Sequence, residues 1–86
     1  MPRYISQHTL ACLTRQGVED LARRMQASAN VTLRRVLVNM QEGKMLAELE
    51  APGREDLEKY FTSENFHFDW ILRVEMEFAN DGLQPV

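Results

Sequence analysis

Residues 45–50 read MLAELE, and this alternation of apolar and charged side chains decides the fold. Successive side chains of a β-strand face opposite ways, so Met45, Ala47 and Leu49 share one face of a predicted strand. The opposite face carries Glu48 and, two residues later, a second glutamate. We expect the first face to be core and the second to lie on a side of a sheet that no helix covers.

The remainder of the chain predicts three further strands and two helices around this stretch. The strands, with their β-branched or alternating apolar residues, are expected at 3–10, 31–40, 43–51 and 69–78. The helices, with apolar stripes at helical spacing, are expected at 13–30 and 54–66. Thr14 is the predicted N-cap of the first helix, and Leu57, Tyr60 and Phe61 form the predicted inner face of the second.

This element order, βαββαβ, is the split-βαβ pattern of the ferredoxin-like sandwich, an α+β fold. Right-handed crossovers place both helices on one face of a four-stranded antiparallel sheet, whose strand order in this fold is 4-1-3-2. We therefore expect a single ferredoxin-like domain over residues 1–79 and a flexible C-terminal tail over residues 80–86.

With both helices on one side, the other face of the sheet is expected to be bare. The helix-covered face of the last strand is expected to take its alternating apolar residues, Leu72, Val74, Met76 and Phe78. The bare face of that strand is expected to take the residues between them, Ile71, Arg73, Glu75 and Glu77. The first strand is undecided: if Ile5 points into the core, then Tyr4, Ser6 and His8 join the carboxylates on the bare face.

Composition and charge exclude several classes of protein. Ten basic and 13 acidic residues give a formal charge of −3, which argues against a nucleic-acid-binding protein. Cys12 is the single cysteine, so no intrachain disulfide is possible and a reducing compartment is indicated. No apolar run suits a signal peptide or reaches the ~18 residues of a membrane span. We expect a soluble, cytoplasmic protein that binds neither nucleic acid nor membrane.

The chain also resembles a bacterial domain-of-unknown-function family, some of whose members are described as nickel-binding proteins. The resemblance extends over about residues 1–78 and is carried by MPRYISQHTL at the start, GKMLAELEAP in the hairpin and DWILRVE before the end. Its individual positions are His8, Gly43-Lys44, Glu50-Ala51-Pro52 and Asp69. The resemblance implies a ferredoxin-like fold that pairs through its sheet face, in the manner of the dimeric α+β barrels.

The chain departs from this family at positions that bear on metal binding. Members often carry a cysteine where this chain has Ala47, and histidines in the second helix where it has Tyr60 and Glu64. His8 is the matching position that remains. With Glu48 and Glu75 on the bare face, it makes a candidate site for a divalent metal, nickel or zinc. The alternative is that the glutamates keep an exposed face soluble, or pair across strands with Arg34, Arg35 and Arg73.

Three functions follow from these observations. The first is a small homodimeric binding protein whose copies meet through the bare sheet face, with a divalent metal or a small molecule as ligand. The second is a cofactor-free enzyme of the dimeric α+β barrel type, monooxygenase- or isomerase-like or a biosynthetic accessory protein, with His8, Tyr4 or Glu48 as acid/base groups. The third is a regulatory domain whose ligand changes its oligomeric state. The residues that would carry catalysis are unknown.

Overall fold

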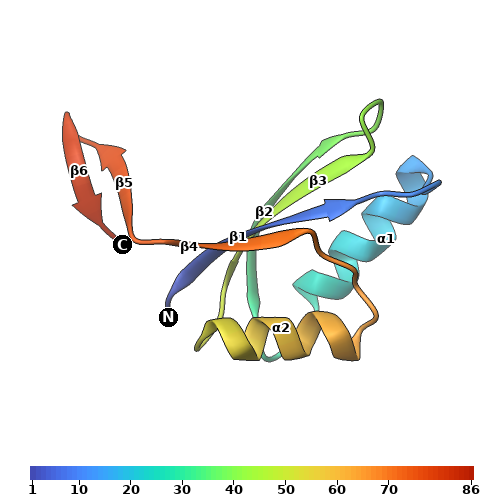
Figure 1. The fold of residues 1–86 in the computed structure, drawn as a ribbon, viewed down its shortest axis with the longest axis horizontal. Helices are drawn as coiled ribbons and strands as arrows, with labels where there is room; N and C mark the ends of the chain where they lie inside the picture. Colours follow the sequence, from blue (N-terminus) through green and yellow to red (C-terminus); the bar gives the residue numbers. More distant parts are fainter.

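The body of the protein is a four-stranded antiparallel sheet with two helices on one face (Figure 1). A computed structural model describes residues 1–86. In chain order its elements are β1 (Arg3–Thr9), α1 (Arg15–Gln26), β2 (Thr32–Asn39), β3 (Lys44–Glu50), α2 (Arg54–Ser63), β4 (Trp70–Val74), β5 (Met76–Ala79) and β6 (Gly82–Pro85). The first six follow the predicted βαββαβ order; β5 then takes the end of the predicted last strand, and β6 lies in the predicted tail. No helix is long and apolar enough to cross a membrane.

The sheet has the strand order β2-β3-β1-β4, which confirms the predicted order 4-1-3-2. All three pairings are antiparallel, and β1 lies between β3 and β4. Strands β2 and β4 are therefore the two edges of the sheet. The chain continues from β4 and leaves the outer side of β2 without a partner strand.

Local sequence explains where α1 begins and which side each helix buries. The Thr14 side chain accepts a hydrogen bond from the Gly17 N–H at 3.1 Å, which confirms the predicted N-cap of α1. Met25 is fully buried on the inner face of that helix. The predicted inner face of α2 is also confirmed, and Phe61 is the largest fully buried side chain of the core.

Strand β3 has the predicted orientation, but β4 is turned by one residue relative to the prediction. Ile71 lies opposite Ser6 and is buried, whereas Leu72 lies opposite Ile5 and is exposed. Asp69 accounts for this register: its N–H donates to the Gln7 carbonyl at 2.7 Å, just before the strand begins. The stretch WILRV carries apolar residues in both alternating sets, so its hydrophobic pattern alone did not determine the orientation.

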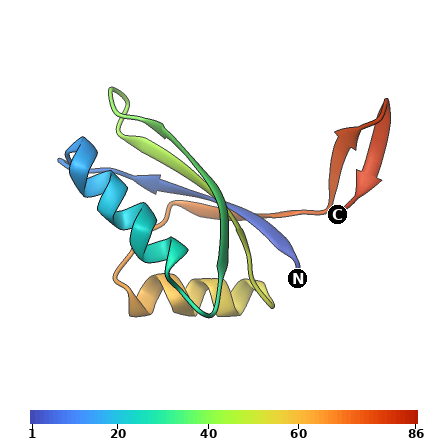
Figure 2. The same cartoon turned by 180° about the vertical axis from the view of Figure 1, so that it is seen from behind.

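The predicted last strand, 69–78, is two strands, and the predicted tail, 80–86, contains a third. β4 ends at Val74, which pairs with Arg3, the first residue of β1. The residue before Arg3 is Pro2, which has no N–H to donate, so the pairing of β4 with β1 does not continue. The chain then folds back as the hairpin β5–β6, with Asn80 and Asp81 both at positive φ in its two-residue turn. This hairpin, residues 76–85, is called the arm. Figure 2 shows it standing away from the body at the end of β4.

Candidate functional site

The face of the sheet that no helix covers, called the open face, contains three rows of cross-strand neighbours that span all four strands, and a shorter row of Asn39, Lys44 and Thr9 at one end. From β2 to β4 the first row is Leu37, Leu46, Gln7 and Trp70. The second row is Arg35, Glu48, Ile5 and Leu72. The third row is Thr32, Glu50, Arg3 and Val74. The rows divide the open face into a charged corner on β2 and β3 and an apolar band that crosses to β4.

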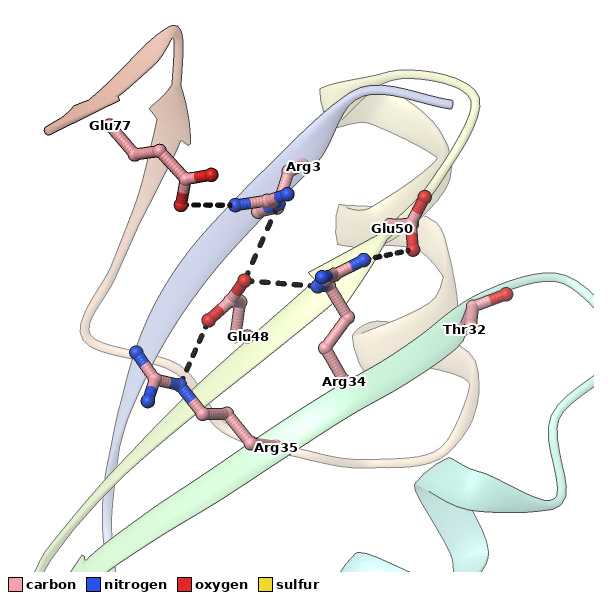
Figure 3. A pocket seen from close by; sticks show the side chains of 7 residues that line it. All are labelled: Arg3, Thr32, Arg34, Arg35, Glu48, Glu50 and Glu77. Atoms are coloured by element: carbon pink, nitrogen blue, oxygen red, sulfur yellow. Dashed lines mark hydrogen bonds and ion pairs between the residues drawn. The ribbon is translucent and has the colours of Figure 1, made fainter. Parts of the chain in front are cut away.

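At the centre of the charged corner, the Glu48 carboxylate is surrounded by three guanidinium groups (Figure 3). It accepts hydrogen bonds from Arg34 Nε at 3.1 Å and Arg35 Nε at 3.0 Å, and Arg3 Nε lies 3.4 Å away. The Glu48 side chain is only 13% exposed, so these contacts are partly shielded from water. Hydrogen bonds between ionised partners are stronger than neutral ones, which makes Glu48 the anchor of this corner.

A β-bulge allows two consecutive arginines to reach the same carboxylate. Consecutive residues of a regular strand face opposite ways, but the register between β2 and β3 shifts between Leu33 and Arg35. The extra residue brings Arg34 to the same side as Arg35, above Glu48. Bulges re-aim side chains in this way. The sequence predicted both arginine pairings, but nothing in it marked the bulge.

Two further ion pairs complete what is called the charged cluster. Arg34 Nη1 donates to Glu50 at 2.9 Å, and this bond together with the nearby Glu48 charge raises the pKa of Arg34. Arg3 Nη1 lies 3.2 Å from Glu77, which belongs to the arm. The members of the charged cluster are Arg3, Arg34, Arg35, Glu48, Glu50 and Glu77. The cluster is electrically balanced, with three positive and three negative groups, and lines a shallow depression without apolar residues.

The predicted pairing of Arg73 with these glutamates is wrong. Arg73 lies opposite Tyr4 on the helix side of the sheet, because β4 is turned by one residue. Arg3 takes the place that was predicted for it. The sequence did contain a signal for Arg3. Side chains alternate along a strand, so if Tyr4 and Ser6 point into the core, Arg3 points to the same face as Glu48.

The apolar band exposes large side chains to solvent. Leu37 on β2 is 52% exposed and Leu72 on β4 is 57% exposed, with Trp70 beside it on the same strand. Ile5 and Leu46 lie between these edges and are half-buried. Isolated exposed leucines are common on protein surfaces, whereas a continuous apolar band across a sheet indicates a surface that meets another molecule.

His8 belongs to the core and not to the bare face considered for it. It lies opposite Met45, under the helices, and its ring meets the Phe61 ring edge-on with centroids 4.9 Å apart. Both ring nitrogens have partners: Nδ1 is 2.7 Å from the His67 carbonyl oxygen and Nε2 is 2.8 Å from Ser6 Oγ. Burial lowers the pKa of His8, which favours the neutral ring, with Nδ1 donating to the carbonyl. The histidine serves as a satisfied polar contact within the core.

The predicted metal ligands are not brought together within one chain. His8 faces the helices, Glu48 faces the open side, and Glu75 lies in the connection between β4 and β5. No group of three or more histidine, cysteine, aspartate or glutamate side chains is arranged to hold a metal ion. The acid/base candidates are separated in the same way, because Tyr4 is buried on the helix side with His8 while Glu48 is on the open face.

Comparison of the chain with protein-family models, with curated proteins and with solved structures gives no match. The functional proposal for this chain therefore rests on the open face, with its charged cluster and apolar band.

Proposed function

We propose that this chain is a ferredoxin-like binding protein that works as a homodimer, in which two copies meet through their open faces in the manner of the dimeric α+β barrels. The observation that carries the proposal is the apolar band, which lies uncovered between the two edges of the sheet. Covering Leu37, Trp70 and Leu72 removes apolar surface from water, at roughly 25 cal/mol per Å². A domain of 86 residues has a small core and gains much from such an interface.

A second copy suits this face better than a nucleic acid or a membrane. The charged cluster carries equal numbers of arginines and glutamates, so two clusters related by a two-fold axis can place opposite charges against each other. A nucleic acid or an anionic lipid surface would require an excess of basic groups, and this chain has a formal charge of −3. Small ligands would bind in the space between the two sheets. The metal site expected from the resemblance has no part in this proposal, because His8 and Glu48 lie on opposite sides of the sheet.

Sedimentation velocity over a range of concentrations tests the proposal with two leucine variants. Leu72→Glu places a carboxylate in the middle of the proposed interface and is expected to weaken dimerisation at least about 100-fold, or about 3 kcal/mol. Leu13→Glu is the control, because Leu13 is also exposed but precedes α1, away from the open face. The control is expected to dimerise like the wild type. A wild-type mass of 10.0 kDa at every concentration would exclude the homodimer.

A further inference from the structure

The arm is incomplete within one chain. The pairs Phe78–Leu83 and Met76–Pro85 place four apolar side chains on one face of the hairpin, and Phe78 is 71% exposed and Leu83 66% exposed. The arm and the four-stranded sheet are separate sheets, with no backbone hydrogen bond between them. An isolated two-stranded hairpin is marginally stable in water. The arm therefore requires a surface that its own chain does not supply.

Strand β2 is incomplete in a complementary way. It pairs with β3 on one side, and the backbone N–H and C=O groups of its outer side have no strand beside them. Its first half carries Arg34 and Arg35, but its second half is the apolar run Val36-Leu37-Val38, of which the last two are exposed. The Arg34 and Arg35 side chains are engaged by Glu48 on the open face, and β2 contains no proline, so its free edge is a template for another strand.

The arm and the β2 strand lie at opposite edges of the four-stranded sheet. The strand order is β2-β3-β1-β4 and the arm follows β4, so three strand spacings, or about 14 Å, separate it from β2. In Figure 1 the arm rises from the end of β4 on the side of the sheet away from α2, which is the open side. Its ion pair between Glu77 and Arg3 holds it on that side. The arm thus extends towards the space that the second copy is proposed to fill.

We propose that the arm of each chain pairs with the β2 edge of the partner chain in the dimer. A two-fold axis that lies between two open faces and parallel to their strands sets β2 of one copy above β4 of the other. The arm that leaves β4 then meets the partner's β2 and adds to it as a strand. Because this axis sets the Val74 end of β4 beside the Thr32 end of the partner's β2, the arm meets that edge at its first half. This inference rests on the proposed homodimer and specifies how the two copies are joined.

The size of the open face supports a contribution from the arm. Four strands spaced about 4.8 Å apart, each about seven residues long at 3.3 Å per residue, project on the order of 450 Å². A stable interface usually buries about 800 Å² on each partner. The four exposed apolar side chains of the arm, with the strand that carries them, add to the area that the sheet face can bury.

Amide hydrogen exchange of β2, measured by NMR on the full chain, tests this proposal with a matched pair of arm variants. Phe78→Ser removes an apolar contact from one face of the arm, and Gln84→Ser changes the opposite face of the same hairpin. In the wild-type dimer we expect protection at the β2 amides that point away from β3. Phe78→Ser is expected to accelerate exchange at those amides at least about tenfold and to weaken the dimer by a similar factor, while Gln84→Ser leaves both unchanged.

The sedimenting mass of the same samples separates the two proposals. Outward β2 amides that exchange freely in a protein of dimer mass would overturn the arm pairing and leave the homodimer standing. Protected amides that Phe78→Ser leaves unaffected would likewise overturn it, since the arm would not be their partner. A mass that keeps rising beyond the dimer would contradict reciprocal pairing. A monomer mass would overturn both proposals. Phe78 lies outside the core, so the variant is expected to fold.

Discussion

The two faces of the four-stranded sheet are built from alternating residues of the same strands, but they differ in how they are covered. On the helix side, Met45, Ala47 and Leu49 are fully buried, and the two buried polar side chains, Ser6 and His8, bond to each other. On the open side, the same strand presents a charged cluster and part of an exposed apolar band. One face is completed by the chain's own helices, and the other has no cover within the chain.

This difference shows that the alternation of MLAELE specifies two surfaces at once. The polar atoms of the helix side are satisfied, and no buried side-chain nitrogen or oxygen lacks a hydrogen-bond partner. The charges of the open side are also paired, in the cluster around Glu48. What remains exposed on the open side is apolar surface and a strand edge. These are the features that bind another protein chain with little need for new charges.

Truncating two consecutive residues of β3 gives the largest expected contrast between the faces. Met45 is fully buried on the helix side, so Met45→Ala is expected to lower the free energy of unfolding by about 2–5 kcal/mol. Leu46→Ala, on the open side, is expected to cost less than about 1 kcal/mol when the protein is dilute enough to be monomeric. Urea unfolding of both variants measures this contrast. Equal losses in dilute protein would mean that the open face is as completely packed as the core.

Removing the charge at the centre of the cluster is expected to have an intermediate effect. Glu48→Gln leaves three guanidinium groups facing an uncharged amide, with an expected loss of about 1–2 kcal/mol after allowance for solvent screening of the more exposed arginines. Glu75→Gln, in the connection between β4 and β5, removes an exposed carboxylate that has no ion pair and is the control. Chemical unfolding at low salt measures both. An unchanged stability in Glu48→Gln would mean that the cluster contributes nothing to the fold.

A smaller contrast is expected from pH, because the helix side contains a buried ionisable ring. Burial lowers the pKa of His8 below its ordinary value of 6.5, so below that pH the unfolded chain takes up a proton that the folded chain does not. Stability is therefore complete above about pH 6.5 and falls as the pH is lowered, by at most about 1.4 kcal/mol per pH unit. Urea unfolding at a series of pH values measures the slope.

His67→Asn is the control for this pH dependence. His67 is exposed, and its backbone carbonyl, which bonds the His8 ring, is retained in the variant. The fall in stability below pH 6.5 is therefore expected to persist. If the substitution abolished it, the dependence would belong to His67 and not to the buried ring. The carboxylate of Asp69, whose pKa is lowered mainly by its hydrogen bond from Thr9, affects stability only at lower pH, below its ordinary 3.8.

How much the sequence could predict depended on whether a strand's two alternating sets differ in polarity. They differ clearly in MLAELE, and its orientation was predicted. In the predicted last strand the polar set came mainly from Glu75 and Glu77, which lie outside β4. Within WILRV both sets contain apolar residues, and the register is set by the Asp69 contact to Gln7, between segments far apart in the chain. The position of His8 depended on the same kind of contact. The arm had a readable signal, because Asn-Asp-Gly between apolar residues is a typical hairpin turn, but the same residues also occur in loose tails.

The most direct test of the open face as an interface uses its own fluorophore. Trp70 is the only tryptophan of the chain and lies on the open face, in the row with Leu37 and Leu46. Acrylamide quenching of its fluorescence should be weak in concentrated protein and should rise on dilution, in step with a fall in sedimenting mass to 10.0 kDa. Quenching that stays constant while the dimer dissociates would contradict the account, because the copies would then meet through another surface.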